Sequence, residues 1–520
     1  MLPNDPHLRP TGSPRHIAAL LAVVFLVVLV LSACSPSGDG DLGEQEAGGS
    51  IFGGEAPTPE ATPTPPFPTR PIYGPGELVD YTAQSGDTLE TLAIRFNTTV
   101  EEIREANTFI PEGTTTMPPG MPMEIPIYYL PLWGSPFQIL PDSLFVNGPA
   151  QVGFDTAAFV DSYPGWLKSY SSYVSEAHRS GAEIVDLIAL RYSISPRLLL
   201  ALLEHHSGAL SNPNPDPVMV DYPLGHRSYE SKGLYLQLGR AANLLNNGYY
   251  QFRRGDLTEM EFRDGRLERF DPWQNAASVS LMNYFNTLLP YEAFREATSE
   301  TGLYAVYKEL FGDPWENQEA HLPGSLTQPE FLLPIEPGYV WAVTGGPHTG
   351  WGQGEPLAAI DFAPPTNRSG CQTSAMWVTA MAAGVVVRSE TGIVVLDLDG
   401  DGDERTGWNI FYLHVATEDR VPAGAQLQAG DRIGHPSCEG GTSTGTHVHI
   451  ARKYNGEWLP AAGIRGKLAF NMEGWVVFEG SRPYLGTLQR FSQVVTACEC
   501  SNAASFIATD RLPIAVSSTD

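Results

Sequence analysis

The spacing of hydrophobic positions changes along the chain and divides it into segments of different kinds. An unbroken apolar run at residues 17–31 is followed by a stretch with few large apolar residues, which extends to about residue 76. Alternating and helical spacings share residues 77–127, helical periodicity covers 150–325, and short β-rich runs broken by glycine begin at Phe331. These patterns predict a multidomain protein with a small βααβ domain, an α-helical middle domain and a C-terminal all-β domain of antiparallel strands.

The apolar run near the N-terminus has the features of an export signal. Arg9 and Arg15 precede it, and its length corresponds to a helix of about 22 Å, short of the roughly 30 Å bilayer core. The ending Leu-Ser-Ala-Cys at residues 31–34 resembles the lipobox of bacterial lipoproteins, in which the cysteine is acylated. That resemblance implies a signal peptide at 1–33, lipidation of Cys34 and a membrane-anchored extracytoplasmic protein. An uncleaved signal anchor is the alternative, and it also places the rest of the chain outside the cytoplasm.

Residues 34–76 are predicted to be a disordered linker. They are rich in proline, threonine and glycine and contain few large apolar side chains. Such a segment cannot bury enough apolar surface to offset the entropy lost on ordering. We expect a semi-extended tether that carries the folded domains away from the membrane.

The first folded segment, residues 77–127, reads as strand, helix, helix, strand. Residues 78–82 alternate as a strand does, and apolar positions recur at helical spacing over 89–96. A second short helix is predicted over 100–106 and ends at Asn107.

The motif residues of this segment resemble a LysM domain across its full length. They are Tyr81, Thr82, Gly86, Asp87, Thr88, Leu89, Ile94, Asn97, Ile103, Asn107 and a closing Gly-x-Pro-x-x-Ile-Pro at 120–126. LysM domains bind the N-acetylglucosamine sugars of peptidoglycan or chitin. The resemblance therefore implies a shallow glycan groove between the 86–88 loop and the exit of the second helix, with Gly86, Asp87, Thr88 and Asn107 as glycan-binding residues. A LysM fold that no longer binds sugar is the alternative.

The clearest helix of the middle region is predicted from its two ends. Ser195 is a good N-cap residue followed by proline at the first helical position, and Gly208 is suited to end the helix. Further helices are predicted at 233–248, 273–289 and 301–310.

This middle region loosely resembles the lysozyme-like domain of soluble lytic transglycosylases, whose catalytic acid directly precedes a Ser-Gly pair. Here His206 precedes that pair, and Glu204 lies about 200° around the helix from His206. A glycosidase needs a carboxylic acid to protonate the glycosidic oxygen. We therefore expect residues 150–325 to be non-catalytic, with glycan cleavage centred on Glu204 as the alternative.

Three motifs with metal-binding side chains stand out in the β-rich region. His348 follows Gly-Gly-Pro and precedes Asp361 by thirteen residues, His414 ends an apolar strand, and His447 and His449 form a His-x-His pair. Because residues i and i+2 of a strand point to the same face, His447 and His449 should project together. Each motif alone is weak evidence for a metal site, since an isolated histidine is usually a turn or surface residue. Together they can supply three zinc ligands, an open position and two bases.

The same motifs resemble the lysostaphin-type zinc endopeptidases, most closely the beta-lytic branch, in which an inserted loop separates the first histidine from the aspartate. The resemblance implies a peptidase domain at 330–485 in which His348, Asp361 and His449 bind one zinc ion. It implies that His414 and His447 are catalytic, one as a general base and one in stabilising the oxyanion, without deciding which does which. The implied substrate is the peptide part of peptidoglycan.

Composition and charge narrow the function classes. The 520 residues are 42% hydrophobic, which is enough for several cores, and Lys+Arg 31 against Asp+Glu 59 gives a net charge of −28. An acidic surface repels phosphate backbones, so no nucleic-acid partner is expected.

An acidic run raises the question of a second cation. Asp397, Asp399, Asp401 and Asp403 match the early ligands of a calcium loop, but Trp408 stands where a bidentate glutamate is needed. The two interpretations are a bound Ca²⁺ and an acidic hairpin turn.

Four cysteines follow the signal segment and can form disulfides. They allow three pairings, and the sequence alone does not choose among them. Pairing of Cys371 with Cys438 is favoured because both lie within one domain, whereas Cys498 and Cys500 are too close in sequence for an ordinary bridge. Residues 486–520 contain no motif and are taken as a C-terminal tail.

The sequence thus predicts a cell-envelope zinc metalloendopeptidase that cleaves stem or cross-bridge peptides of peptidoglycan and is targeted by a LysM domain. One alternative is a non-catalytic peptidoglycan-binding scaffold or an activator of another wall hydrolase. Members of this peptidase family with that role typically lack a ligand, and this chain lacks none. The other alternative is a muramidase that acts through the helical domain.

Overall fold

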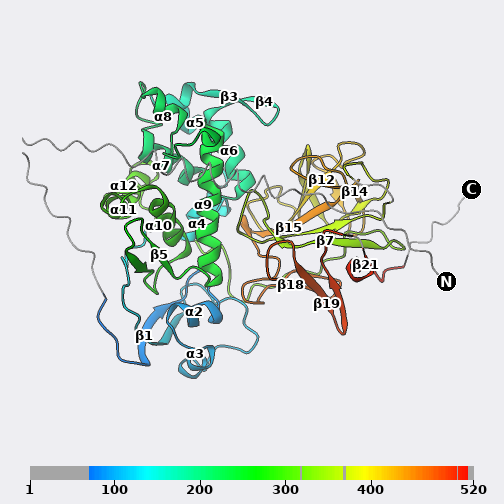
Figure 1. Cartoon of the computed structure of the whole chain (residues 1–520), viewed down its shortest axis with the longest axis horizontal. Helices are drawn as coiled ribbons and strands as arrows, with labels where there is room; N and C mark the ends of the chain where they lie inside the picture. The colour runs from blue at the N-terminus through cyan, green and yellow to red at the C-terminus, as the bar shows by residue number, and fades with distance from the viewer. Residues whose placement is uncertain (1–69, 317–318, 367–369, 501, 513–520) are drawn as a thin grey trace, which may run out of the picture. The chain divides into compact units, whose positions relative to one another are not determined.

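The computed structural model describes residues 70–316, 319–366, 370–500 and 502–512, which belong to one compact unit (Figure 1). The predicted signal peptide, Cys34 and most of the predicted linker lie outside the described residues. Within the described part of the chain, every helix is too short or too polar to cross a membrane.

The N-terminal part of the described chain has the predicted βααβ fold. Strand β1 (Glu77–Thr82) pairs antiparallel with β2 (Pro122–Ile127), and helices α2 (Leu89–Arg95) and α3 (Val100–Ala106) lie between them in sequence. Thr88 caps α2 by accepting the Thr91 N–H. The core contains Val79, Leu89, Leu92, Phe96, Ile103, Ile125 and Ile127.

The helical region begins at residue 142, before the predicted start at 150. Its helices are α4 (Asp142–Phe145), α5 (Thr156–Asp161), α6 (Gly181–Tyr192), α7 (Pro196–Ser207), α8 (Pro217–Asp221), α9 (Leu234–Arg254), α10 (Ala276–Leu288), α11 (Tyr291–Ala297) and α12 (Leu303–Phe311). Short 3-10 helices are η1 (Pro149–Gln151), η2 (Trp166–Ser169) and η3 (Tyr229–Ser231), and the hairpins are β3 (Ser171–Val174) with β4 (Ala177–Ser180) and β5 (Glu259–Glu261) with β6 (Leu267–Arg269).

Helix α7 forms where its caps predict it. The Ser195 hydroxyl accepts the Leu198 N–H at 3.2 Å, and Gly208 ends the helix in the left-handed region at φ 59°. The Glu204 carboxylate accepts the N–H groups of Leu210 and Ser211, so it caps the turn after the helix. Glu204 is therefore occupied as a structural acceptor.

Helix α9 is longer than the predicted 233–248. Gly248 does not end it but lies inside it against α10, where a Cβ would stand 2.9 Å from the Ser280 Cα. The glycine allows close helix packing, and the helix ends instead at Gly255, with φ 76°.

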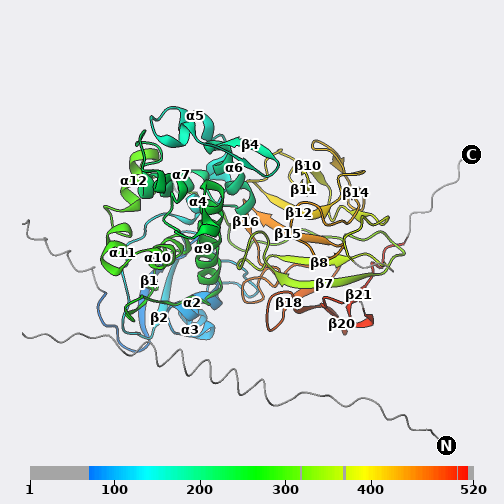
Figure 2. The ribbon, with the colours of Figure 1, turned by 45° about the horizontal axis from the view of Figure 1, so that its top comes forward.

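The C-terminal β region is built on one nine-stranded antiparallel sheet, whose central strands lie side by side in Figure 2. Its strand order is β13-β10-β11-β12-β15-β8-β7-β21, with β16 paired to β15. The strands are β7 (Trp341–His348), β8 (Ala359–Ala363), β10 (Gly384–Glu390), β11 (Gly392–Asp397), β12 (Trp408–Val415), β13 (Gln426–Leu427), β15 (Val448–Tyr454), β16 (Glu457–Trp458) and β21 (Phe506–Ile507).

Both faces of this sheet are covered. Residues such as Val343, Ile360 and Ile450 belong to a core within the β region, whereas Phe411, Leu413 and Ala451 join the core of the helical region. Strands buried on both faces read as nearly continuous apolar runs, which is the pattern seen in the sequence.

The predicted C-terminal tail is wrong for residues 486–507, because they extend the fold. The strands β19 (Gly486–Arg490) and β20 (Gln493–Thr496) complete a four-stranded sheet with β17 (Asn471–Met472) and β18 (Trp475–Glu479). The strands β9 (Val378–Thr379) and β14 (Arg432–Gly434) form a separate two-stranded sheet. After η4 (Ala503–Ser505), β21 pairs with β7, the strand that carries His348.

The described residues contain two disulfides. Cys371 is joined to Cys438, as expected. Cys498 is joined to Cys500, which corrects the expectation that these two would not pair with each other.

Candidate metal centre

The strand register brings two of the predicted ligands together. Asp361 on β8 and His449 on β15 are directly opposite each other in the antiparallel ladder, so their side chains share a face of the sheet. His348 stands at the end of β7, which pairs with the other edge of β8. A Cβ at Gly345 would overlap the Asp361 carboxylate, so glycine leaves room for it.

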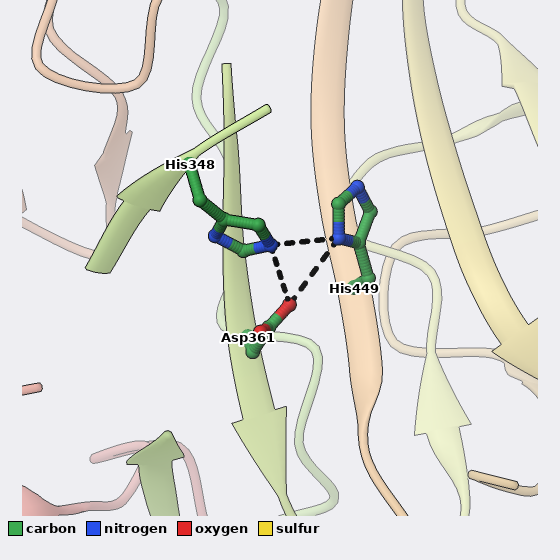
Figure 3. Close-up of side chains that lie close together, drawn as sticks. All are labelled: His348, Asp361 and His449. Atoms are coloured by element: carbon green, nitrogen blue, oxygen red, sulfur yellow. Dashed lines mark hydrogen bonds and ion pairs between the residues drawn. The ribbon is translucent and has the colours of Figure 1, made fainter. Parts of the chain in front are cut away.

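The three side chains converge on one point (Figure 3). His348 Nε2 lies 2.9 Å from His449 Nδ1 and 3.2 Å from Asp361 Oδ1, and His449 Nδ1 lies 3.3 Å from the same oxygen. All three residues are buried, with exposed fractions of 2% for His348 and 6% for Asp361 and His449.

The hydrogen bonds made by the outer ring nitrogens of His348 and His449 show which inner ring nitrogens face the centre without a proton. His348 Nδ1 donates to the Gly346 carbonyl oxygen at 2.8 Å, and His449 Nε2 donates to the Gly350 carbonyl oxygen at 3.1 Å. In the neutral rings, His348 Nε2 and His449 Nδ1 are then both acceptors. Asp361 Oδ1 is buried and has no hydrogen-bond partner among the residues that the structure describes. Three acceptors facing one another fit a divalent cation that takes nitrogen and oxygen ligands.

The electrostatics of the centre also favour positive charge. Burial alone would raise the pKa of Asp361, but His348, His449 and His447 hold it well below its usual value. Burial works in the opposite direction on His348, yet the Asp361 charge raises its pKa. The ionised carboxylate thus attracts a proton or a metal ion to this position.

His414 and His447 lie beside the three converging residues. Their ring centroids are 4.5 Å apart, and His447 Nε2 is 3.7 Å from Asp361 Oδ1. Each donates Nδ1–H to a carbonyl oxygen, His414 to Glu439 at 2.9 Å and His447 to Gly445 at 2.8 Å. Burial, and then His447, lower the pKa of His414 to about 4, so it is neutral near pH 7. Its Nε2 is therefore available as a base.

A β-bulge directs the His414 side chain. The register of β11 against β12 shifts next to His414, which has φ 67°, and Leu413 is the residue that pairs with His449. Regular alternation would turn His414 to the opposite face from His449, and the bulge changes that direction.

Tyr484 contacts the centre and was missed by sequence reasoning. Its ring stacks on His348 from the loop between β18 and β19, more than a hundred residues along the chain. No motif surrounds it, so the sequence contains no signal for this contact.

The disulfide between Cys371 and Cys438 adjoins residues that contact His414 or neighbour His447 in sequence. Cys438 directly precedes Glu439, the partner of His414. The Thr446 hydroxyl, next to His447, donates to the carbonyl oxygens of the residues on either side of Cys371.

The predicted glycan-binding residues have internal partners in this structure. Asp87, with 4% exposed, accepts from Tyr81, Arg95 and the Gln84 N–H. Thr88 is fully buried as the α2 cap, and Asn107 bonds Ile103 and Glu124 in the LysM core. A Cβ on Gly86 would overlap Arg253 of α9. These four residues lie within one small domain, and their contact with sugar stays a prediction.

The acidic run is only partly assembled. Carboxylate oxygens of Asp397, Asp399 and Asp401 lie within 4.8 Å of one another. Asp403 does not join them and instead pairs with Arg405 at 2.6 Å, which corrects its assignment to the same cation site. The calcium interpretation has no support beyond this clustering.

Two family models match the chain. Residues 81–126 match the LysM domain, and residues 138–324 match the LasA N-terminal domain. The lysozyme-like resemblance of the helical region is not confirmed.

The curated relatives are metallopeptidases and the protease LasA. Protease LasA of Pseudomonas aeruginosa is 29% identical over 343 residues, which are 62% of this chain and 75% of LasA. The beta-lytic metalloendopeptidase of Achromobacter lyticus is 31% identical over 147 residues, 26% of this chain and 37% of that protein. The beta-lytic metalloendopeptidase of Lysobacter enzymogenes is 28% identical over 128 residues, 24% of this chain and 70% of that protein.

Solved structures with similarity include a metalloprotease and a peptidase domain. The M23 metalloprotease pseudoalterin is 23% identical with a TM-score of 0.28, covering 33% of this chain and 96% of pseudoalterin. The catalytic domain of lysostaphin from Staphylococcus simulans is 22% identical with a TM-score of 0.17, covering 24% of this chain and 89% of that domain. The chain is thus homologous to LasA and to the beta-lytic metalloendopeptidases, and it contains a LysM domain and a LasA N-terminal domain.

Proposed function

We propose that this protein is a cell-envelope zinc endopeptidase that hydrolyses peptide bonds of peptidoglycan. The observation that carries the proposal is the convergence of three buried acceptor atoms, which belong to His348, Asp361 and His449. His414 and His447 lie beside them. Two imidazoles and one carboxylate are a ligand set of catalytic zinc, which keeps one position open for water or substrate.

The chain's own residues divide the remaining work. His348, Asp361 and His449 would hold zinc, which when bound would supply Lewis-acid activation of water and of the scissile carbonyl group. Nε2 of His414 or His447 accepts the proton of the attacking water and later passes it to the leaving amine. Nε2 of the other histidine, when protonated, donates a hydrogen bond to the carbonyl oxygen as negative charge develops there. The carbonyl partners at Nδ1 hold both rings in place for these steps.

Two other parts of the chain place this chemistry on its substrate. The LysM domain binds peptidoglycan glycan, and acylated Cys34 anchors the protein in the membrane outside the cytoplasm. The helical region contributes no glycan cleavage, because its Glu204 carboxylate is occupied by two backbone N–H groups. Replacing Cys34 with serine should abolish metabolic labelling of the protein with fatty acid.

Product analysis of digested sacculi separates this function from the alternatives. The full chain, His348→Ala and Glu204→Gln are each incubated with purified peptidoglycan, and soluble products are identified by mass spectrometry. We expect new free amines with the full chain and Glu204→Gln, and none with His348→Ala. New reducing sugar ends that depend on Glu204 would indicate a muramidase. Absence of any product with the full chain would indicate a scaffold or activator.

A further inference from the structure

Residues 321–326, called here the crossing segment, run between two loops of the LysM domain. On one side the segment meets the loop at 84–88. The Leu322 N–H donates to the Ser85 hydroxyl oxygen at 2.9 Å, and that hydroxyl lies 3.2 Å from the Leu322 carbonyl oxygen. The first loop therefore holds the segment through its backbone.

On the other side the segment meets the loop that follows α3. The Thr116 hydroxyl donates to the Pro323 carbonyl oxygen at 2.8 Å, and the Ser325 N–H donates to the Thr116 carbonyl oxygen at 2.9 Å. The Leu326 N–H lies 3.1 Å from the Thr116 hydroxyl, and Thr115 donates to the Leu326 carbonyl oxygen at 2.7 Å. Both loops thus use their hydroxyl groups on the same short piece of chain.

The fit between the segment and the LysM domain is close. Leu322 and Leu326 are 1% and 5% exposed and pack together with Leu459 of the β region. Gly324 lies against Pro118, where a Cβ would stand 2.7 Å from the Pro118 Cα. A larger residue at 324 cannot occupy this position without moving the segment.

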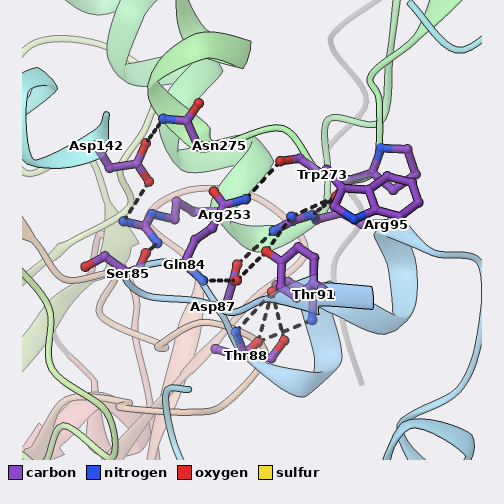
Figure 4. Close-up of polar contacts among 12 residues, drawn as sticks. Gln84, Ser85, Asp87, Thr88, Thr91, Arg95, Asp142, Arg253, Trp273 and Asn275 are labelled. Atoms are coloured by element: carbon purple, nitrogen blue, oxygen red, sulfur yellow. Dashed lines mark hydrogen bonds and ion pairs between the residues drawn. The ribbon is translucent and has the colours of Figure 1, made fainter. Parts of the chain in front are cut away.

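A buried ionic cluster fixes the start of the segment. His321 Nε2 lies 2.5 Å from Glu457 Oε2, and Arg253 Nη2 lies 3.2 Å from the same oxygen and 3.3 Å from Asp142 Oδ2. Arg253 also donates to the Ser85 carbonyl oxygen, and Figure 4 shows its contacts with Ser85 and Asp142. Together with its contact to Glu457, one guanidinium thus joins the LysM loop, the helical region and the β region.

We infer that the crossing segment occupies the glycan groove of this LysM domain as an internal ligand, so that a glycan chain and residues 321–326 compete for one site. The inference rests on the glycan binding assigned to LysM under the proposed function. The groove expected from the sequence lies between the 86–88 loop and the exit of α3. The segment meets Ser85 and lies against Gly86 on one side. On the other side it meets Thr115 and Thr116, in the loop that leads from α3 to β2.

Competition has a measurable consequence. A tethered segment is present at high effective concentration. The apparent affinity for glycan is therefore the intrinsic affinity multiplied by the fraction of molecules in which the groove is open. By linkage, bound glycan must favour release of the segment by the same factor. The LysM domain then binds glycan tightly only when the segment has left, and release loosens the connection between the helical and β regions.

Binding of the N-acetylglucosamine pentamer to the full chain tests the inference. Titration calorimetry compares the unaltered protein with Gly324→Val, in which the added side chain displaces the segment from Pro118. Ser325→Asn is the matched control, because Ser325 is exposed, has φ 51° and donates its backbone N–H to the Thr116 carbonyl oxygen, which the substitution keeps. We expect at least about tenfold tighter binding for Gly324→Val and unchanged binding for Ser325→Asn.

Hydrogen exchange on the unaltered protein tests the same point without a mutation. Saturating pentamer should speed exchange of the Leu322, Ser325 and Leu326 amides and leave the Ile103 amide of α3 unchanged. Equal pentamer affinity in all three proteins, protection of the segment amides by pentamer, or no binding by Gly324→Val would each overturn the inference. Zinc content and amine release do not enter either measurement, so a failure of the peptidase proposal would be seen separately.

Discussion

The ring of Tyr484 stacks on the imidazole of His348, with ring centroids 4.2 Å apart and ring planes 20° from parallel. The backbone reinforces this contact. The Gly346 N–H donates to the Tyr484 carbonyl oxygen at 2.8 Å, and the Tyr484 N–H donates to the Pro347 carbonyl oxygen at 3.1 Å. The loop between β18 and β19 therefore supports the strand end that carries His348, a proposed metal ligand. Residues that hold a ligand in position commonly tune metal affinity.

Replacing Tyr484 with alanine should weaken zinc binding by about tenfold, because His348 loses the ring that restricts its orientation. Tyr484→Phe keeps the ring and should keep the zinc affinity. Competition with a chromogenic chelator measures both constants. Equal weakening in the two variants would assign the effect to the hydroxyl group and not to stacking.

Removing the disulfide between Cys371 and Cys438 should lower kcat while the zinc content stays unchanged. The bridge supports the backbone around the partners of His414 and His447, and small displacements of catalytic groups cost about tenfold or more in rate. The double variant Cys371→Ser, Cys438→Ser is compared with Cys498→Ser, Cys500→Ser, which removes the distant bridge. Loss of zinc from the first variant would show that the bridge supports the ligands themselves.

The free energy of unfolding should decrease as pH falls because of a half-buried histidine in the helical region. His206 lies near Tyr284, and burial, followed by the neighbouring His205 and His226, lowers its pKa to about 3. The unfolded value is about 6.5. Between these values the unfolded chain binds a proton that the folded chain does not, so the free energy of unfolding decreases as pH falls, by up to about 1.4 kcal/mol per pH unit. Above about pH 6.5 the histidine is neutral in both the folded and the unfolded state, and it no longer lowers the free energy of unfolding.

Thermal melts between pH 7 and pH 5 measure this effect. His206→Gln should show a shallower loss of Tm than the unaltered protein, because glutamine does not titrate. His178→Gln is the control, since His178 is exposed, and its Tm should follow the unaltered protein. Identical pH slopes for His206→Gln and the unaltered protein would contradict the burial argument.

The five residues of the centre should separate into two groups by metal content. Alanine at His348, Asp361 or His449 removes one of three ligands and should empty the site. Alanine at His414 or His447 should keep close to a full zinc complement yet reduce turnover by about 10²–10⁴-fold, the range of general acid–base catalysis. Zinc retained in His449→Ala, or lost in His447→Ala, would reverse the roles within the His-x-His pair.

Local signals made parts of the structure predictable. The Ser195 cap and Gly208 located α7 because helix ends depend on nearby backbone groups. The shared direction of His447 and His449 followed from the two-residue period of a strand. The strand pairing places Asp361 opposite His449.

Features that depend on distant contacts were not predictable. Gly248 reads as a helix end, but its role is to let α10 approach α9. Tyr484 and the crossing segment reach their partners only through the tertiary fold, and neither carries a motif. Their positions are set by packing between regions far apart in sequence, which local periodicity does not encode.

Metal removal and return tests the central claim most directly. The purified full chain should contain about one zinc ion per chain, lose amine release from peptidoglycan after chelation, and regain it when zinc is added back, whereas His348→Ala should bind no zinc and show no recovery. Undiminished amine release by the metal-free protein or by His348→Ala would contradict the account.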